Sequence, residues 1–320
     1  MNTNKPGLSV VIPVTERVDD PKLLFGEYRK ALDALDMSYE MIFVIDGEFQ
    51  DFRQGVDALA EEHSNLSIIQ LGKAFGESTA LSAGFDRARA AMILTLPAYI
   101  QCEPQELGKL FDKIESADMV LARRWPRVDS AALQSRTRLF NRLVALLTAE
   151  TFDDLGCGVR LIRRAVVDDV PIYGDQHRFM PILAARRGFR IEQVDLTQSQ
   201  HDSVRKKPPL GAYPRRLLDL LTVFFLVKFT KKPLRFFGLL GTATMAVGLI
   251  GLLVVVLQRV LFELPLADRP ALLLSSLLIV LGVQLLAIGL VGEIVIFTHA
   301  KDMKEYTIKE IVGNHSTVAD

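Results

Sequence analysis

Apolar runs alternate with amphipathic segments over the first hundred residues of the chain. Four short runs rich in Val, Ile and Leu predict buried strands at residues 7–14, 39–47, 66–72 and 91–97. The segments between and after them predict helices at about residues 21–35, 52–63 and 76–90. Strands that alternate with helices of this length indicate an α/β fold with a doubly wound, mostly parallel sheet.

The last third of the chain follows a different pattern. Residues 236–257 contain no charged side chain, and residues 271–297 contain only Glu293. Because a bilayer core requires roughly 20 apolar residues, we expect two transmembrane helices, with a buried helical hairpin as the alternative. Residues 213–229 begin with basic side chains and continue with Leu, Val and Phe. They predict a helix in the membrane interface, or one that packs on the soluble domain.

These patterns divide the chain into four parts. We expect a soluble domain at residues 1–210, an amphipathic interface region at 211–235, two transmembrane helices at 236–300 and a tail at 301–320. Lysine and arginine gather before the first span and after the second, whereas the connection between the spans has balanced charge. The positive-inside rule therefore predicts a multi-pass protein of the inner membrane with both termini in the cytoplasm. The N-terminus does not have the pattern of a signal peptide.

Charge and cysteine content exclude some classes of function. Lys plus Arg and Asp plus Glu both number 38, so the overall charge does not point to a nucleic-acid partner. The two cysteines, Cys102 and Cys157, lie far apart in the chain and form no CxxC motif. Neither a disulfide framework nor a zinc site is expected from this spacing.

Polar side chains follow the predicted strands at their carboxyl ends, where open α/β sheets bind ligands. The candidates at these positions are Thr15, Glu16, Asp46, Glu48, Lys73 and the turn at residues 97–101. Asp46 and one further segment have plain structural alternatives. Asp46 could cap the following helix, and the small residues after Gly76 could serve close packing on the sheet. Gly76 itself could let backbone amides approach a phosphate.

Eight segments of the chain then carry a resemblance. In order they are VVIPVTER, EMIFVIDGEFQD, GKAFGESTALSAGFDRARA, LTLPAYIQCEPQEL, LARRW, DDLGCGVRLIRR, HRFMPILAARRGFRIEQVDL and GAYPRRLLDLLTVFF. This series resembles the inverting glycosyltransferases of family 2 with a GT-A fold. It is most similar to their polyprenyl-phosphate branch, which includes dolichol-phosphate mannose synthase and the undecaprenyl-phosphate sugar synthases. The likeness extends from about residue 7 to residue 298 and includes the two spans.

The resemblance implies transfer of a sugar from a nucleotide-sugar to a polyprenyl phosphate or another membrane lipid, with inversion. It also implies a set of site residues. The nucleotide-sugar would contact Pro13, Thr15, Glu16, Asp46, Lys73 and Tyr99; catalysis would involve Gln101, Arg123 and Arg160; and the acceptor phosphate would meet His177, Arg178, Arg205, Lys206 and Lys207. A structural role is the alternative for His177. Arg127, Arg163 and Arg164 are expected to be solvated surface arginines.

The chain departs from the family at the turn that normally reads DADLQDPPE. There the family's acids hold Mg²⁺ or Mn²⁺ against the donor's diphosphate, but Pro97 and Tyr99 replace the two aspartates, while Gln101 is kept. No metal ligand is therefore assigned, and three explanations stay open. Basic side chains, namely those of Arg123, Arg160 and Arg178, could replace the ion, or Glu103 or Glu106 could supply a displaced ligand. The third explanation is that the protein has lost transfer activity and only binds.

Three functions are consistent with this sequence. The leading hypothesis is a membrane-anchored glycosyltransferase, and its rival is a silent GT-A scaffold that binds nucleotide or a partner glycosyltransferase. A processive polysaccharide synthase is disfavoured, because such enzymes usually have more spans than two. Homo-oligomerisation is expected from the family and from a GxxxG-like face in the first span. That face consists of Gly238, Gly241, Gly248 and Gly251.

Overall fold

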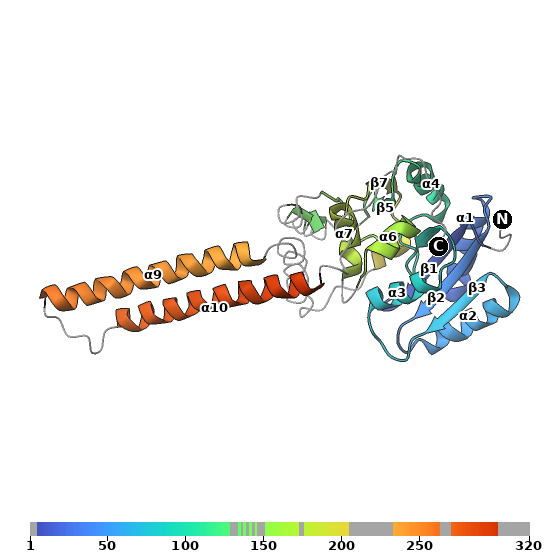
Figure 1. Ribbon diagram of the computed structural model, residues 1–320. Helices are drawn as coiled ribbons and strands as arrows, with labels where there is room; N and C mark the ends of the chain where they lie inside the picture. The colour runs from blue at the N-terminus through green and yellow to red at the C-terminus, as the bar shows by residue number, and fades with distance from the viewer. Residues whose placement is uncertain are drawn as a thin grey trace, which may run out of the picture. The chain divides into compact units, whose positions relative to one another are not determined.

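The computed structural model describes residues 5–128, 151–172, 176–204, 233–262 and 270–299, with scattered residues between 134 and 145. The chain divides into two compact units (Figure 1), of which one is the α/β domain and the other contains the two C-terminal helices. Three sequence predictions fall outside the described residues. They are the basic residues Arg205, Lys206 and Lys207, the interface helix at 213–229, and the tail at 301–320.

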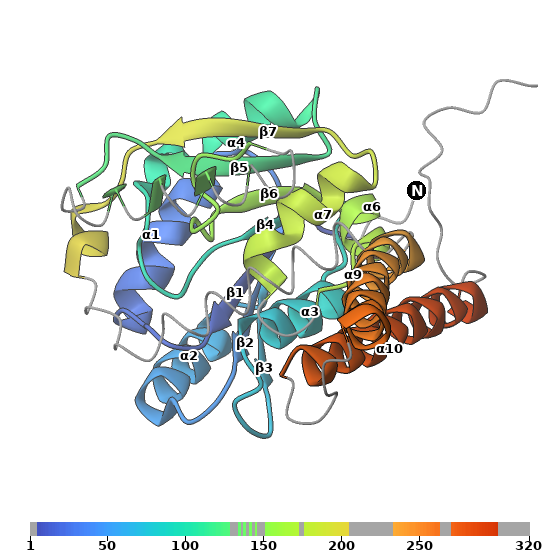
Figure 2. The ribbon, with the colours of Figure 1, turned by 90° about the vertical axis from the view of Figure 1, so that its left-hand side faces the viewer.

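The α/β domain is built on a seven-stranded sheet with the order β3-β2-β1-β4-β6-β5-β7. The strands are β1 (Leu8–Val14), β2 (Tyr39–Ile45), β3 (Leu66–Gln70), β4 (Met92–Thr95), β5 (Met119–Arg124), β6 (Arg160–Arg163) and β7 (Ile191–Leu196). Only β6 runs antiparallel, against both β4 and β5. The order can be followed in Figure 2 from β7 at the top to β3 at the bottom. The predicted mostly parallel sheet and its first four strands are confirmed.

Helices cover both faces of the sheet. They are α1 (Pro21–Asp33), α2 (Gln50–Glu62), α3 (Glu77–Arg87), α4 (Gly108–Ile114), α6 (Arg164–Asp169) and α7 (Met180–Arg186), with 3-10 turns η1 (Pro104–Glu106), η2 (Gln176–Phe179) and η3 (Gln200–Val204). Strand β1 shows why there are two layers, because Val10 and Ile12 belong to the core under α1, α2 and α4, whereas Val11 belongs to the core under α3, α6 and α7. Side chains alternate across a strand, so the uninterrupted apolar residues 10–12 fill both cores.

Close packing fixes α3 against the sheet. A Cβ atom on Gly84 would lie 2.3 Å from Cγ1 of Val11 and 3.2 Å from Cγ2 of Val44. The backbone of α3 therefore approaches β1 and β2 more closely than any side chain would allow. The packing interpretation of the small residues in this segment is confirmed, at least for Gly84.

The second unit contains α9 (Pro233–Phe262) and α10 (Pro270–His299), which pack side by side (Figure 1). Both helices are long and apolar enough to cross a membrane. A Cβ on Gly241 would lie 2.7 Å from the carbonyl oxygen of Gly282, and one on Gly248 would lie 2.8 Å from that of Ser275. A Cβ on Gly251 would lie 2.5 Å from Oγ of Ser275, so three of the four glycines that suggested an oligomer interface form a contact within one chain. Homo-oligomerisation stays a prediction that rests on the family alone.

Candidate functional site

The loops at the carboxyl ends of β1, β2 and β4 meet at one edge of the sheet, because these strands are parallel neighbours. Thr15 is half-buried and Glu16 exposed just after β1, and Pro13 is buried inside the strand. Residues 97–101, which follow β4, are called the β4 turn below. This is the turn in which Pro97 and Tyr99 stand in place of the family's aspartates.

The β4 turn has a defined shape although its acids are missing. The backbone amide of Asp19 donates to the carbonyl oxygen of Ala98 at 2.9 Å, and the carboxylate of Asp19 accepts from the amide of Ile100 at 3.0 Å. The hydroxyl of Tyr28 donates to the carbonyl oxygen of Pro97 at 2.9 Å. Burial raises the pKa of Tyr28, so the phenol stays protonated as a donor. The loop after β1 and helix α1 thus hold the turn by its backbone.

An arginine that the sequence analysis missed lies on this turn. The guanidinium of Arg17 stacks over the ring of Tyr99, 4.3 Å from its centroid. Its Nη2 donates to the carbonyl oxygen of His201 at 2.6 Å, and its other contacts are ion pairs with Asp202 at 3.6 Å and Asp19 at 3.8 Å. The signal in the sequence was its place three residues after a strand.

Gln101 connects the turn to a second loop. Its side chain is buried, and its Oε1 accepts from the amide of Gly158 at 2.7 Å while its Nε2 donates to the hydroxyl of Tyr99 at 3.1 Å. The adjacent Cys102 brings its Sγ to 3.9 Å from that of Cys157, and both thiols are free. The residue expected to be catalytic therefore fixes the position of Tyr99 and of the loop before β6; its catalytic role stays a prediction.

The side chains of the β4 turn do not fit a divalent metal ion. Pro97 has no side-chain donor, and Tyr99 offers a neutral phenol where a hard cation prefers carboxylates. Glu106, one of the two displaced acids considered, accepts from the amide of Thr197 at 2.7 Å and so faces β7. Glu103 stays a possible ligand. Within the described residues, no group of three or more His, Cys, Asp or Glu side chains gathers in a metal-binding arrangement.

Arg123 is paired with two carboxylates. Its Nη2 lies 2.6 Å from Oδ2 of Asp195, its Nε also donates to Asp195, and its Nη1 lies 2.7 Å from Asp153. The hydrogen bonds to Asp195, joined by those to Asp153, raise the pKa of Arg123 in spite of partial burial. Its charge is largely compensated, and its contact with a diphosphate stays a prediction.

Arg124, the next residue of β5, lies inside the domain. Its side chain is 3% exposed and binds Asp154 through Nε and Nη2 at 2.7 and 2.8 Å, while Nη1 binds Asp202 at 3.0 Å. Burial opposes the charge of Asp154, but the hydrogen bonds and charges of Arg124 and Arg127 lower the pKa of that carboxyl to about 2. Arg127 lies 2.6 Å from Asp154 and is 11% exposed. The expectation of a solvated Arg127 is wrong.

Arg163 and Arg164 also differ from their expected solvated state. Arg163 donates to the carbonyl oxygens of Ala117 and Ile114 at 3.1 and 2.7 Å, and Arg164 donates to that of Phe85 at 3.0 Å. Each guanidinium replaces missing backbone donors at the end of a helix or strand. Both arginines therefore stabilise the fold.

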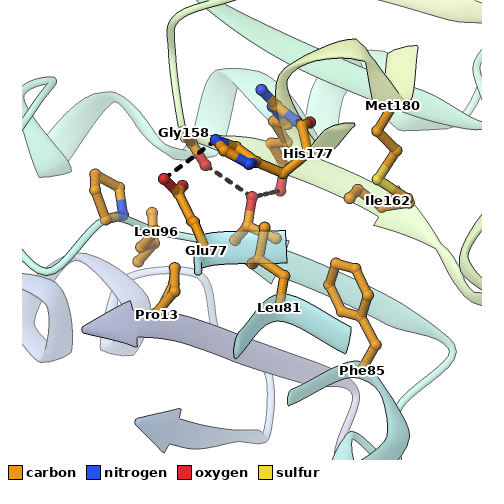
Figure 3. A pocket seen from close by; sticks show the side chains of 12 residues that line it. Pro13, Glu77, Leu81, Phe85, Leu96, Gly158, Ile162, His177 and Met180 are labelled. Atoms are coloured by element: carbon orange, nitrogen blue, oxygen red, sulfur yellow. Dashed lines mark hydrogen bonds and ion pairs between the residues drawn. The ribbon is translucent and has the colours of Figure 1, made fainter. Parts of the chain in front are cut away.

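His177 and Glu77 face a small pocket between the sheet and α3 (Figure 3). Nε2 of His177 lies 3.2 Å from the Glu77 carboxylate, and Nδ1 lies 3.2 Å from Oγ of Ser78. Burial would raise the pKa of Glu77, but the hydrogen bond and charge of His177, with Arg178 and Arg160, lower it. Glu77 was not among the predicted site residues. It follows Gly76 directly, and only the packing of η2 on α3 shows its proximity to His177.

Arg160 is buried and lines the same pocket. Its guanidinium donates to the carbonyl oxygens of Cys157, Leu155 and His177, so backbone acceptors occupy it. Burial lowers the pKa of Arg160. It holds η2 and the loop before β6 together, and a direct contact with the diphosphate stays a prediction. Arg178, half-buried beside His177, keeps its predicted contact with the acceptor phosphate as an untested role.

Asp46 binds the loop that precedes α3. Its two carboxylate oxygens accept from the amides of Phe75 and Gly76, both at 2.7 Å. The alternative in which Asp46 caps α2 is therefore wrong, and the amide of Gly76 is already used. Carboxylate oxygens can accept further hydrogen bonds, so the predicted nucleotide contact stays open. The amine of Lys73 lies 5.1 Å from the centroid of the Phe75 ring at the same loop.

Comparisons with known proteins agree with this architecture. Residues 9–170 match the family model described as glycosyl transferase family 2. The chain is 29% identical to an undecaprenyl-phosphate 4-deoxy-4-formamido-L-arabinose transferase from Aeromonas hydrophila, over 99% of this chain and 97% of that protein. It is 25% identical to a dodecaprenyl-phosphate galacturonate synthase from Rhizobium johnstonii, over 97% and 94% of the two chains.

A solved structure shows the same fold. The crystal structure of a mycobacterial protein superposes with a TM-score of 0.51 and 19% sequence identity, and covers 68% of this chain and 74% of its own. At this identity the likeness concerns the fold alone.

Proposed function

Because the chain belongs to glycosyl transferase family 2, we propose that it transfers a sugar from a nucleotide-sugar to a polyprenyl phosphate at a membrane. The observation that carries this proposal is the match to the Aeromonas hydrophila transferase, which covers 99% of this chain. The match therefore includes α9 and α10 as well as the α/β domain. An acceptor with a long apolar chain fits a protein that has two helices apolar enough to span a bilayer.

In the proposed reaction, a phosphate oxygen of the lipid attacks the anomeric carbon of the sugar. The bond from that carbon to the donor's diphosphate breaks, a nucleoside diphosphate leaves, and the configuration inverts. The acceptor phosphate is already an anion at neutral pH, so the reaction requires little general base. Catalysis then depends on the position of the two substrates and on compensation of the charge that develops on the leaving group.

The places proposed for the two phosphates adjoin one another, because Pro13 and Pro97 line the same pocket as His177. The donor would lie along the carboxyl ends of β1, β2 and β4, near Thr15, Asp46 and the β4 turn. The acceptor phosphate would approach His177 and Arg178, with Arg205, Lys206 and Lys207 near the lipid headgroups. In this arrangement the active site lies on the cytoplasmic side of an inner membrane, as the charges that flank the spans predict.

The replaced aspartates favour a second candidate, a silent scaffold that binds nucleotide without transfer. Pro97 and Tyr99 remove the usual means of stabilising the leaving diphosphate. The matched relatives are transferases over nearly their whole length, which supports an active enzyme.

The deciding experiment uses the full-length chain purified in mild detergent. Radiolabelled UDP-, GDP- and dTDP-sugars are each incubated with undecaprenyl phosphate, with and without EDTA. Transfer should give one labelled lipid from one donor class, with release of one nucleoside diphosphate for each lipid formed. If none of the donors is consumed while a nucleoside diphosphate still binds, the scaffold is the better description.

A further inference from the structure

We propose that Arg17 supplies, at the β4 turn, the positive charge that a metal ion would bring to the donor's diphosphate. The inference rests on the proposed function, since it presumes a nucleoside diphosphate as the leaving group. From the sequence, Arg123 and Arg160 were expected to replace the metal ion, and this inference assigns that role to Arg17 instead.

The position of Arg17 supports this assignment. Strands β1 and β4 are parallel neighbours, so the loop that carries Arg17 and the turn that carries Tyr99 lie at the same edge of the sheet. Tyr99 occupies one of the two places where the family has an aspartate, and the guanidinium lies 4.3 Å from the centroid of its ring. A cation therefore rests on the side chain that replaces a metal ligand.

Arg17 lies near two carboxylates, as a bound metal ion would. Its guanidinium lies between the carboxylates of Asp19 and Asp202, at 3.8 and 3.6 Å. The Asp19 carboxylate also accepts from the amide of Ile100, so it belongs to the turn itself. The turn thus has neutral side chains where the family has two aspartates, and the guanidinium of Arg17 on Tyr99 supplies a positive charge there.

The guanidinium of Arg17 is also paired less closely with carboxylates than those of Arg123 and Arg124. Arg123 and Arg124 each form a two-point contact with one carboxylate at hydrogen-bond distance and reach a second carboxylate as well. Both ion pairs of Arg17 exceed hydrogen-bond distance, and its Nη1 has no hydrogen-bond partner among the described residues. Its side chain is 28% exposed. Nη1 is itself buried, so the guanidinium must turn before its unpaired N–H donors meet a diphosphate, which arginine binds well through two parallel hydrogen bonds.

Tyr99 has a defined part in this arrangement. Gln101 donates to its hydroxyl at 3.1 Å, which fixes the ring, and the ring face attracts the guanidinium. An aspartate at position 99 would form an ion pair with Arg17 and compete with the diphosphate. The Tyr99→Asp variant should therefore bind nucleotide more weakly, even when Mg²⁺ or Mn²⁺ is present.

The test compares Arg17→Ala, Arg17→Gln and Arg17→Lys in the full-length chain. Binding of UDP and GDP is measured by calorimetry in EDTA, and transfer is measured with the donor identified for the wild type. Loss of a charge-assisted contact should weaken binding of the preferred nucleotide about ten- to a hundredfold in the Ala and Gln variants. Transfer should fall by about two to three orders of magnitude. Arg17→Lys keeps the charge without the planar fork and should lie between these and the wild type.

Two controls separate charge from folding. Arg29→Gln removes a comparable exposed arginine of α1, which pairs with Asp33 at 3.4 Å, and should leave binding and transfer unchanged. Arg17→Lys keeps the positive charge, so a larger loss in Arg17→Gln than in Arg17→Lys reports the charge. Each variant must show the same thermal unfolding as the wild type, followed by the fluorescence of Trp125.

The outcomes distinguish this inference from the proposed function. If the wild type transfers sugar and the folded Arg17→Gln variant does so equally well, the role of Arg17 is refuted while the function stands. If nucleotide binding depends on Arg17 but no donor is turned over, the contact is supported and the transferase activity is not. If EDTA abolishes nucleotide binding and Mn²⁺ restores it, a metal ion performs this role and the inference is wrong.

Discussion

At the scale of single residues, the two neighbouring arginines of β5 show how position on a strand decides the role of a side chain. Arg123 is partly exposed and pairs with Asp153 and Asp195, whereas Arg124 is buried with Asp154 and Asp202. Successive side chains of a strand point to opposite faces, so the two guanidinium groups meet different surroundings. The buried network joins β5 to the loop before β6 and to η3.

Loss of Asp154 should strongly destabilise the α/β domain. The Asp154→Asn variant leaves the buried charge of Arg124 without its two-point partner, which typically costs about 3–5 kcal/mol. Urea unfolding of the full-length chain, followed by the fluorescence of its only tryptophan, Trp125, would measure this loss. Asp153→Asn is the matched control, because that carboxylate is 63% exposed and should contribute at most about 1 kcal/mol. Equal effects of the two variants would contradict the burial of the network.

The same carboxylate gives a signed dependence on pH. The pKa of Asp154 is lowered from 3.8 to about 2 in the folded chain. Its contribution to stability is therefore complete above pH 3.8 and decreases as the pH falls towards about 2. Between these values the wild type should lose more stability than Asp154→Asn, in the same fluorescence assay. Parallel pH profiles of the two proteins would show that Asp154 titrates normally.

At the scale of elements, helix α3 approaches the sheet closely at Gly84. The chain offers a matched comparison at Gly26 of α1, where a Cβ atom would meet nothing within 4 Å. Both glycines lie within helices, so the gain of helix propensity on change to alanine is similar. Only the space around the new methyl group differs.

Gly84→Ala should therefore destabilise the domain, and Gly26→Ala should stabilise it. In Gly84→Ala the new methyl group would collide with Val11 and Val44, so we expect the free energy of unfolding to fall by about 1–3 kcal/mol. Gly26→Ala should raise stability by about 0.5–1 kcal/mol, because alanine loses less backbone entropy on folding. Thermal unfolding of both variants in the same detergent would measure the two changes. A stabilised Gly84→Ala variant would show that α3 is not packed in this way.

The contact between α9 and α10 follows the same principle in an apolar setting. Small residues let the two backbones approach closely, which is the usual basis of helix association in membranes. The side chain of Glu293 accepts from the amide of Leu234 at 3.4 Å, so it caps the start of α9 within the same unit. An acidic residue at a helix N-terminus satisfies a free amide and complements the helix dipole.

At the scale of the whole molecule, the order of a soluble domain, a basic segment and two apolar helices predicts one orientation in the membrane. Lys231, Lys232 and Arg235 lie at the beginning of the first span, and Lys301 and Lys304 follow the second. Translocation of either group would be opposed by its positive charge. The α/β domain and the C-terminus should therefore both stay in the cytoplasm.

Reporter fusions can test this orientation. Alkaline phosphatase, which is active only outside the cytoplasm, should be inactive when fused after residue 320 and active when inserted at residue 265, between the spans. Green fluorescent protein at the same two positions should give the opposite pattern and serves as the control. An active phosphatase at the C-terminus would reverse the predicted topology.

The sequence by itself was sufficient for the first four strands, the first three helices, the family and the two apolar helices. Strands, helices and spans are visible because burial imposes a local period or an uninterrupted apolar run on neighbouring residues. The order of short motifs identified the family. Comparison with the same motifs showed that Pro97 and Tyr99 replace the family's two aspartates. The sequence also placed candidate residues at the correct edge of the sheet, since polar residues that follow parallel strands must lie there.

Only the tertiary structure decided which of these side chains meet. Arg17 stacks on Tyr99, Asp46 binds the amides at residues 75 and 76, and Cys102 lies beside Cys157. Each of these contacts joins segments that are separate in the chain, and no local pattern records such a distance. Arginines that looked alike in the sequence differ for the same reason: a guanidinium bound by carboxylates or carbonyls stabilises the fold, and one with looser partners remains available to a ligand.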